Sequence, residues 1–182
     1  MRFSHVAIAR AVSRIAGPGK AWGMSHLLAI YLQDHHAGSS VGVALARRAA
    51  GANRGNDYGE ELAAIAAEID EDRRALERVM KALDVEPARL KDGAARVAEK
   101  AGRLKRNGTW LSYSPLSRLV EIEGLETAVG GKQALWDTLA AVLDEPPAGV
   151  DFAALAERAA GQRERLEALS RRAAREAFVP TS

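Results

Sequence analysis

The sequence lacks cysteine altogether, in a chain of 182 residues. Disulfides, thiolate metal sites and thiol catalysis are therefore excluded, and we expect a cytoplasmic protein, because disulfides are typical of oxidising compartments. Aromatic residues are also scarce, at 5%. Alanine, leucine, arginine and glutamate are frequent instead, and these residues lose little conformational freedom in a helix. The composition favours an all-α fold, and the length suits one domain.

Long apolar runs are missing too, since none approaches the roughly 18–20 residues that a membrane-spanning helix needs. Residues 1–23 contain no acid and four Arg or Lys residues, namely Arg2, Arg10, Arg14 and Lys20. The arginines interrupt the apolar core that a signal peptide requires. We expect a basic N-terminal extension over 1–23, broken by the Gly-Pro-Gly sequence at 17–19. Contact of this extension with a membrane surface is an alternative, and Met24 is a second candidate start.

No large excess of one charge is present, because 26 basic residues face 24 acidic ones and the net charge is +2. This balance argues against the whole chain being a nucleic-acid-binding protein. The segment 89–106 is locally basic, however. Charge runs of this kind are usually solvated helix faces. The alternative is an anion-binding patch for nucleic acid or phospholipid, with Arg103, Lys105 and Arg106 as its candidate ligands.

Helix start and stop signals, together with apolar residues at spacings of three and four, predict four helices over 25–50, 57–83, 114–143 and 151–178. The fourth is followed by a loose tail at 179–182. The start signals are Ser25 for the first helix, a capping box of Asp57 and Glu60 for the second, Ser114 followed by Pro115 for the third, and Asp151 for the fourth.

Polar residues interrupt three of the apolar stripes. Asp72 falls within the stripe of the second helix, which is otherwise Leu62, Ile65, Ile69, Leu76, Val79 and Leu83. Lys132 lies on the same side of the third helix as Ile122, Leu125, Val129, Trp136, Leu139 and Leu143, so we expect at least its aliphatic stem to be buried. Gln162 occupies a stripe position of the fourth helix.

The connections between these helices favour one topology. Short loops predict that the first and second helices, and the third and fourth, are antiparallel neighbours, whereas a long helical crossover joins the second to the third. One long crossover is the arrangement of ferritin-like bundles. On this topology and on the polar residues in its stripes, the chain resembles the ferritin-like superfamily, in particular its small uncharacterised bacterial members. The resemblance implies a single ferritin-like four-helix bundle over 24–178.

The resemblance also implies a candidate iron or manganese site. Such sites use one Glu from each of two helices and a Glu-x-x-His pair from each of the other two, because two divalent ions need anionic oxygens and imidazoles. The match is partial, because the sequence has no Glu-x-x-His and all four histidines precede residue 37. The candidate ligands are His35, Glu68, Asp72 and Glu123.

A structural interpretation uses much the same residues without a metal. A buried carboxylate needs a partner, and Lys132 is a partner that a metal site does not explain, because a cation repels cations. We therefore expect a polar network that sets the register of the helices, with Gly38 and Gly42 letting a neighbouring helix come close. Its members are Asp34, His35, Asp72, Glu123 and Lys132.

A ligand pocket is the remaining interpretation, in which Lys132 or His35 binds a small anion between walls of Tyr31 and Trp136. The sequence holds no phosphate-binding loop and no residues spaced as a catalytic triad. We expect a non-enzymatic bundle without a cofactor that forms a homodimer through an alanine-rich face. A degenerate iron or manganese oxidoreductase or storage protein is the alternative.

Overall fold

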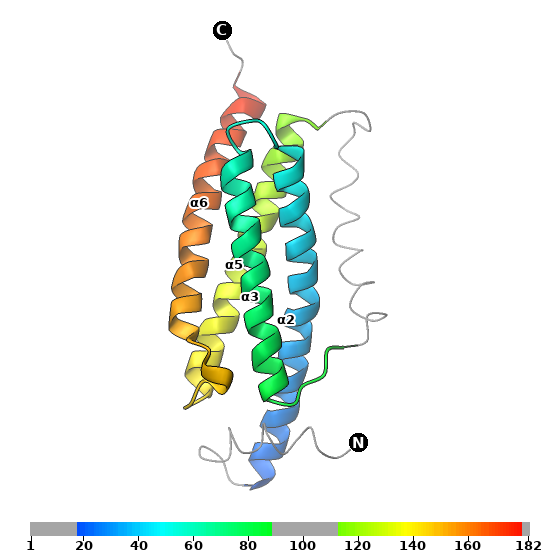
Figure 1. Cartoon of the computed structure of the whole chain (residues 1–182), viewed down its shortest axis with the longest axis vertical. Helices are drawn as coiled ribbons and strands as arrows, with labels where there is room; N and C mark the ends of the chain where they lie inside the picture. The colour runs from blue at the N-terminus through cyan, green and yellow to red at the C-terminus, as the bar shows by residue number, and fades with distance from the viewer. Residues whose placement is uncertain (1–17, 89–112, 180–182) are drawn as a thin grey trace.

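The chain folds as a four-helix bundle in the computed structural model, which describes residues 18–88 and 113–179. Its helices are α2 (Pro18–Ala52), α3 (Gly59–Ala82), α5 (Pro115–Val142) and α6 (Phe152–Phe178), with a short 3-10 turn, η1 (Pro147–Gly149), before α6 (Figure 1). No strand occurs in these two ranges, so the predicted all-α class is confirmed. None of the helices described there is long and apolar enough to cross a membrane.

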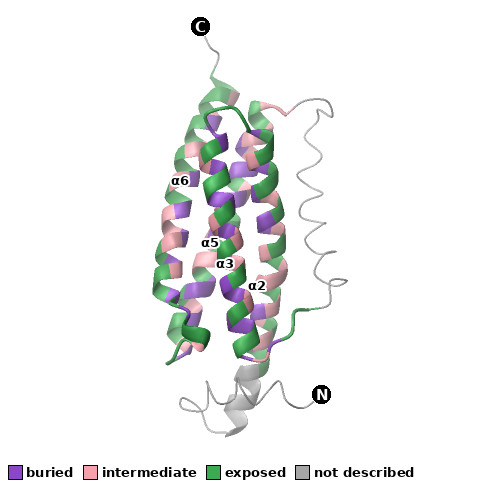
Figure 2. Cartoon of the chain, viewed as in Figure 1, coloured by how far each residue is buried: buried purple, intermediate pink, exposed green. Residues whose placement is uncertain are grey.

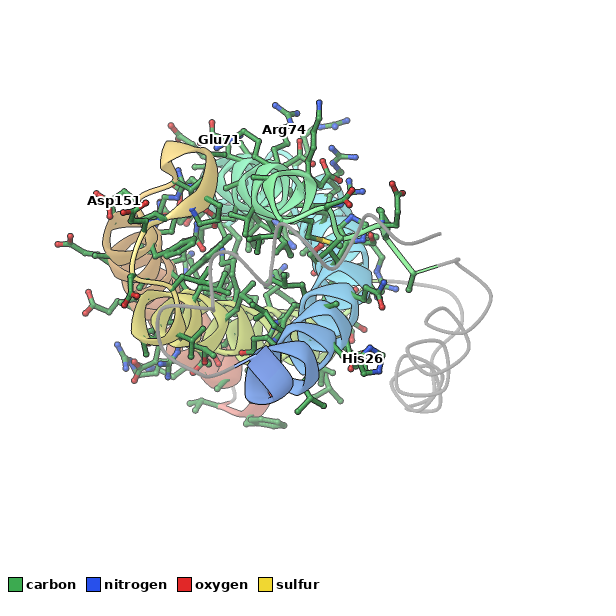
Figure 3. The ribbon with its side chains drawn as sticks, turned by 90° about the horizontal axis from the view of Figure 1, so that it is seen from below. His26, Glu71, Arg74 and Asp151 are labelled. Carbon is green, nitrogen blue, oxygen red and sulfur yellow. The ribbon has the colours of Figure 1, made fainter. Side chains whose placement is uncertain are left out.

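In Figure 1, α2 runs up, α3 and α5 run down, and α6 runs up. Each helix is therefore antiparallel to the two helices that lie beside it in the bundle. Seen along the bundle, they occupy four corners, with α2 diagonally opposite α6 and α3 diagonally opposite α5 (Figure 3). Charged side chains such as Glu71 and Arg74 lie on the outer side of α3, and His26 lies on the outer side of α2. The chain therefore leaves α3 at one end of the bundle and enters α5 at the other.

The start signals of α5 and α6 are confirmed. Ser114 is the N-cap of α5, and its hydroxyl oxygen accepts a hydrogen bond of 3.1 Å from the backbone N–H of Ser117. Asp151 is the N-cap of α6, and its carboxylate accepts a bond of 3.0 Å from the backbone N–H of Ala154. Each cap satisfies one of the amide groups that a helix leaves without a partner in its first turn.

The start signals of α2 and α3 were wrong. Helix α2 begins at Pro18 rather than after Ser25, because a proline is compatible with the first turn of a helix. The N-cap of α3 is Tyr58, without a side-chain cap bond, so Asp57 forms no capping box. The side chain of Asn56 accepts the backbone N–H of Tyr58 instead, at 3.0 Å, and Asp57 pairs with Arg172 of α6 at 2.7 Å.

Two apolar clusters fill the bundle, one in each half, and buried residues line its interior (Figure 2). All the stripe positions predicted for α3 and α5 are confirmed as buried apart from Lys132, whose side chain is 14% exposed. Ile69 belongs to one cluster and Leu76 to the other, so the buried Asp72 lies at the boundary between them. The core is thus divided by a polar layer near the middle of the bundle.

Replacing Ser114 with alanine tests the contribution of the α5 cap. We expect Ser114→Ala to lower the free energy of unfolding by about 1 kcal/mol, because the amide of Ser117 loses its acceptor. The measurement is urea unfolding followed by circular dichroism. Ser40→Ala, at an exposed position inside α2, serves as the control and should cost nothing. Equal stabilities of the two variants would contradict the role of the cap.

Candidate functional site

A buried carboxylate lies at the centre of the candidate site. The side chain of Asp72, on α3, is 0% exposed. Its Oδ1 accepts a hydrogen bond from Arg158 of α6, and its Oδ2 accepts one from the ammonium of Lys132 of α5. The amide of Gln162 on α6 donates to the same Oδ2 at 3.3 Å. Three helices therefore meet on one anion, whose charge is balanced by two cations.

Further contacts extend this pairing along α3 and α6. The amide oxygen of Gln162 accepts a bond from Lys132, and its amide nitrogen donates to Glu68 at 3.0 Å. Glu68 also pairs with Arg165, which reaches Glu61 at 3.2 Å. We call the six residues that make up this network the central ion cluster: Glu68, Asp72, Lys132, Arg158, Gln162 and Arg165. Its acids all come from α3 and its bases from α5 and α6.

Burial and charge act in opposite directions on Lys132. Burial lowers the pKa of its ammonium, and the adjacent Asp72 carboxylate opposes this effect. The positive charge of Arg158, which shares Asp72, lowers the pKa of Lys132 further. The charge of Lys132 therefore depends on its contact with the buried Asp72 carboxylate rather than on contact with water.

A cavity of about 490 Å³ lies between α2, α3 and α5, beside the central ion cluster. Asp72 and Lys132 form part of its wall. The exposed residues Asp34, Gly38 and Gly131 also line this central cavity, so it opens to the surface between α2 and α5. Most of the remaining wall is apolar and includes Tyr31, Ile69, Leu76, Val129, Leu135 and Trp136.

Two glycines of α2 leave this space empty. A Cβ atom at Gly38 or Gly42 would meet nothing within 4 Å, and both residues line the cavity. The expectation that they let another helix come close is therefore wrong. The close approach of α2 to α5 occurs at Gly124 instead, where a Cβ atom would lie 3.3 Å from Cδ2 of Leu45. Gly38 and Gly42 thus create a gap in the wall of α2 rather than a tight contact.

His35 lies in the wall near the aromatic side chain of Tyr31. The two ring centroids are 4.5 Å apart in an edge-on arrangement. Burial lowers the pKa of His35, and the nearby Asp34 carboxylate only partly opposes this effect. The imidazole is therefore neutral at neutral pH, with one nitrogen that donates and one that accepts. The adjacent His36 points elsewhere and contacts Glu77 of α3 at 3.4 Å.

The structure brings together only part of the predicted polar network. Lys132 and Asp72 are in contact, whereas Asp34 and His35 line the cavity without a hydrogen bond to either of them within the described residues. Glu123 is exposed on α5, so its place in the network was wrong. The buried glutamate of α5 is Glu121, two residues earlier. It lies one helical turn before Leu125, on the same face of the helix.

The residues do not fit the predicted iron or manganese site. Among the residues of 18–88 and 113–179, no group of three or more His, Asp or Glu side chains could hold a metal ion. Both oxygens of Asp72 already accept hydrogen bonds from cations, which would repel a metal. His35, Glu68, Asp72 and Glu123 are therefore not a ligand set. The predicted anion-binding residues Arg103, Lys105 and Arg106 lie outside the described residues.

A second polar cluster, which the sequence did not reveal, lies at the opposite end of the bundle from Trp136. The carboxylate of Glu121 accepts a bond from Nε of Arg48 at 2.7 Å and from the hydroxyl of Tyr113 at 3.1 Å. The Tyr113 hydroxyl in turn accepts a bond of 2.8 Å from the amide of Asn53. Burial is the main cause that raises the pKa of Tyr113 to about 12. These contacts join the end of α2 to the start of α5.

Arginines and a tyrosine continue this cluster toward α6. The guanidinium carbon of Arg118 lies 4.4 Å from the ring centroid of Tyr58, and that of Arg172 lies 4.7 Å from it. Arg118 also donates to the side-chain oxygen of Asn53 at 2.7 Å and to Glu176 at 2.7 Å. Cation–π contacts and ion pairs of this kind hold the helix ends together. The polar groups of this second cluster bond mainly to one another, so we assign them a structural role.

Comparisons with known proteins identify no relative. No family model matches the chain, and neither the curated proteins nor the solved structures contain a match. The function must therefore be inferred from the geometry of the site itself.

Substitutions in the central ion cluster should have unequal costs. We expect Asp72→Leu to lower the free energy of unfolding by about 3–5 kcal/mol, because it leaves Lys132 and Arg158 without their shared anion. Lys132→Met should cost less, about 1–3 kcal/mol, because Arg158 and Gln162 still bind Asp72. Urea unfolding measures both. Glu60→Leu, which removes an exposed carboxylate of the same helix that has no ion pair within the described residues, is the control. Lys132→Met costing more than Asp72→Leu would contradict this assignment.

The second cluster makes a prediction for alkaline pH. The unfolded chain releases the Tyr113 proton near its ordinary pKa of 10.0, whereas the folded protein keeps it to about 12. The folded state thus binds more protons in this window, and Tyr113 makes the protein less stable as pH rises through it. In an ultraviolet titration, Tyr113→Phe should remove a phenol that ionises near pH 12. Glu121→Gln should lower that pKa. If Tyr113→Phe instead removed a phenol that ionises near pH 10, the raised pKa of Tyr113 would be contradicted.

Proposed function

We propose that this chain is a non-enzymatic bundle protein that binds a small, largely apolar molecule in its central cavity, while the central ion cluster has a structural role. The observation that supports binding is the cavity itself. Its volume of about 490 Å³ lies within the range of roughly 300–1,000 Å³ that is typical of small-molecule sites. A mostly apolar wall with a few polar groups is also typical of such sites.

The glycines of α2 support this proposal independently of the volume. A Cβ atom at Gly38 or Gly42 would meet only open space, so alanine would fit at either position, and it would favour the helix, since glycine is a poor helix former. Filling the cavity would therefore improve folding. Two glycines at these positions, in the middle of a long helix, are more readily explained by a requirement for space than by stability.

The contacts of the ion cluster support a structural role rather than catalysis. The carboxylate of Asp72 accepts hydrogen bonds from Lys132, Arg158 and Gln162. Three of its roughly four lone-pair sites are therefore already used, which favours a structural role over that of a general base. We also propose a ferritin-like topology. It is supported by the directions of the four helices and by the passage of the chain from one end of the bundle to the other between α3 and α5.

Binding of 1-anilinonaphthalene-8-sulfonate tests the proposed function. This probe has an aromatic body with one anionic group, and its fluorescence rises when it enters an apolar site. We expect saturable binding by the wild-type protein. Gly42→Leu should weaken binding by about tenfold or more, which corresponds to about 1.4 kcal/mol, because the new side chain occupies the cavity.

Gly161→Leu is the matched control. A Cβ atom at this α6 position also meets nothing within 4 Å, but the residue does not line the central cavity. Both leucine variants should remain folded, which a single cooperative unfolding transition would verify. Wild-type affinity in Gly42→Leu, or an equal loss in Gly161→Leu, would show that the central cavity is not the binding site.

A further inference from the structure

The wall of the central cavity contains hydrogen-bond donors that have no partner among the described residues. The indole N–H of Trp136 is one of them, and the Nε–H of Arg73 is another; both atoms are buried. Trp136 as a whole is 0% exposed, so a ligand reaches its N–H only when the neighbouring side chains shift. Lys132 provides a third donor, because its ammonium has three N–H groups and donates two, to Asp72 and Gln162. All three side chains line the cavity.

The acceptors of the same wall are largely engaged. Asp72 uses both of its oxygens within the central ion cluster. Asp34 is exposed, so water can solvate its carboxylate. The neutral imidazole of His35 offers one donor and one acceptor, which leaves the balance unchanged. The buried part of the wall therefore has an excess of donors, and buried donors without a partner are costly and seldom left that way in folded proteins.

We propose that the ligand of the central cavity is an aromatic compound with a hydrogen-bond-accepting group, best a carboxylate, which binds the free N–H groups of Trp136, Arg73 and Lys132. This inference rests on the proposed function and specifies its ligand class. The accepting oxygens satisfy the unpaired donors, and the aromatic body packs against the apolar wall. Hydrogen bonds in which one partner is charged are stronger than bonds between neutral partners.

The same charges disfavour a cationic ligand. Lys132 and Arg73 line the cavity, and Arg158, which pairs with Asp72, does not. Arg73 also pairs through another nitrogen with Glu77, at 3.0 Å, and Glu77 is not part of the wall. The two carboxylates of the wall do not offset this effect. Asp72 is already shared by two cations, and Asp34 is hydrated. An ammonium group would therefore find a hydrated carboxylate at the opening and would leave the buried donors unsatisfied.

Three naphthalene derivatives with one body and different head groups test the proposal. They are naphthalene-2-carboxylate, naphthalene-2-carboxamide and 2-naphthylmethylammonium, and isothermal titration calorimetry at neutral pH gives their dissociation constants. We expect the carboxylate to bind most tightly and the amide next. The ammonium compound should bind about tenfold or more weakly than the carboxylate, because it can accept no hydrogen bond from the wall.

Trp136→Phe isolates one of the three donors. It removes the indole N–H and keeps an aromatic ring, so we expect weaker binding of the carboxylate by about threefold to tenfold and little change for the ammonium compound. Tyr31→Phe is the matched control, because the Tyr31 hydroxyl already donates to Thr138, at 3.4 Å. It should leave the ratio of the two dissociation constants unchanged.

The outcomes separate the two proposals. Tighter binding of the ammonium compound than of the carboxylate, or an unchanged ratio in Trp136→Phe, would overturn the ligand class, while loss of all binding in Gly42→Leu would still support the cavity as the site. Binding that Gly42→Leu leaves intact for every compound would instead overturn the proposed function.

Discussion

The burial of one carboxylate near the middle of the bundle constrains most of this structure. An anion with no exposed surface is tolerated only if cations reach it, and here they come from two other helices. Lys132 and Arg158 can both contact Asp72 in only one register of α3, α5 and α6. A shift of either partner helix by one turn, about 5.4 Å, would leave the charges unpaired. The ion cluster thereby sets how the helices are aligned, and the two apolar halves of the core pack around it.

The central cavity follows from the same layer. Helix α2 takes no part in the ion cluster, and at this height it presents Gly38 and Gly42, which have no side chain to fill the remaining volume. Asp72 and Lys132 form part of the wall of this space, so the wall is polar there and is not closed by apolar packing alone. The cavity thus exists without a bound molecule, which would lower the entropic cost of binding the proposed ligand.

Particular residues show why some expectations held and others did not. Asp72, Lys132 and Gln162 were identified because a period of three to four residues reports which side chains face inward, whatever they face. Glu123 was named as the glutamate of the third helix, whereas Glu121, one turn before Leu125, is the buried one. Asp57 had the spacing of a capping residue, but Arg172 from the far end of the chain binds its carboxylate. Whether each of these polar residues or glutamates faces inward depends on the period of its own helix. The partner of Asp57 depends on a contact with another helix.

The sequence by itself determined the helical class, the four main helices, the starts of α5 and α6, and the inward faces of α3 and α5. All of these depend on interactions within a few residues along the chain. Only the tertiary structure decided which cation meets which anion, that Arg158 shares Asp72, and that two glycines border an open space. A glycine in a sequence is compatible both with close packing and with a cavity, and only the position of the opposing helix distinguishes them. That position depends on long-range contacts, which no local pattern reports.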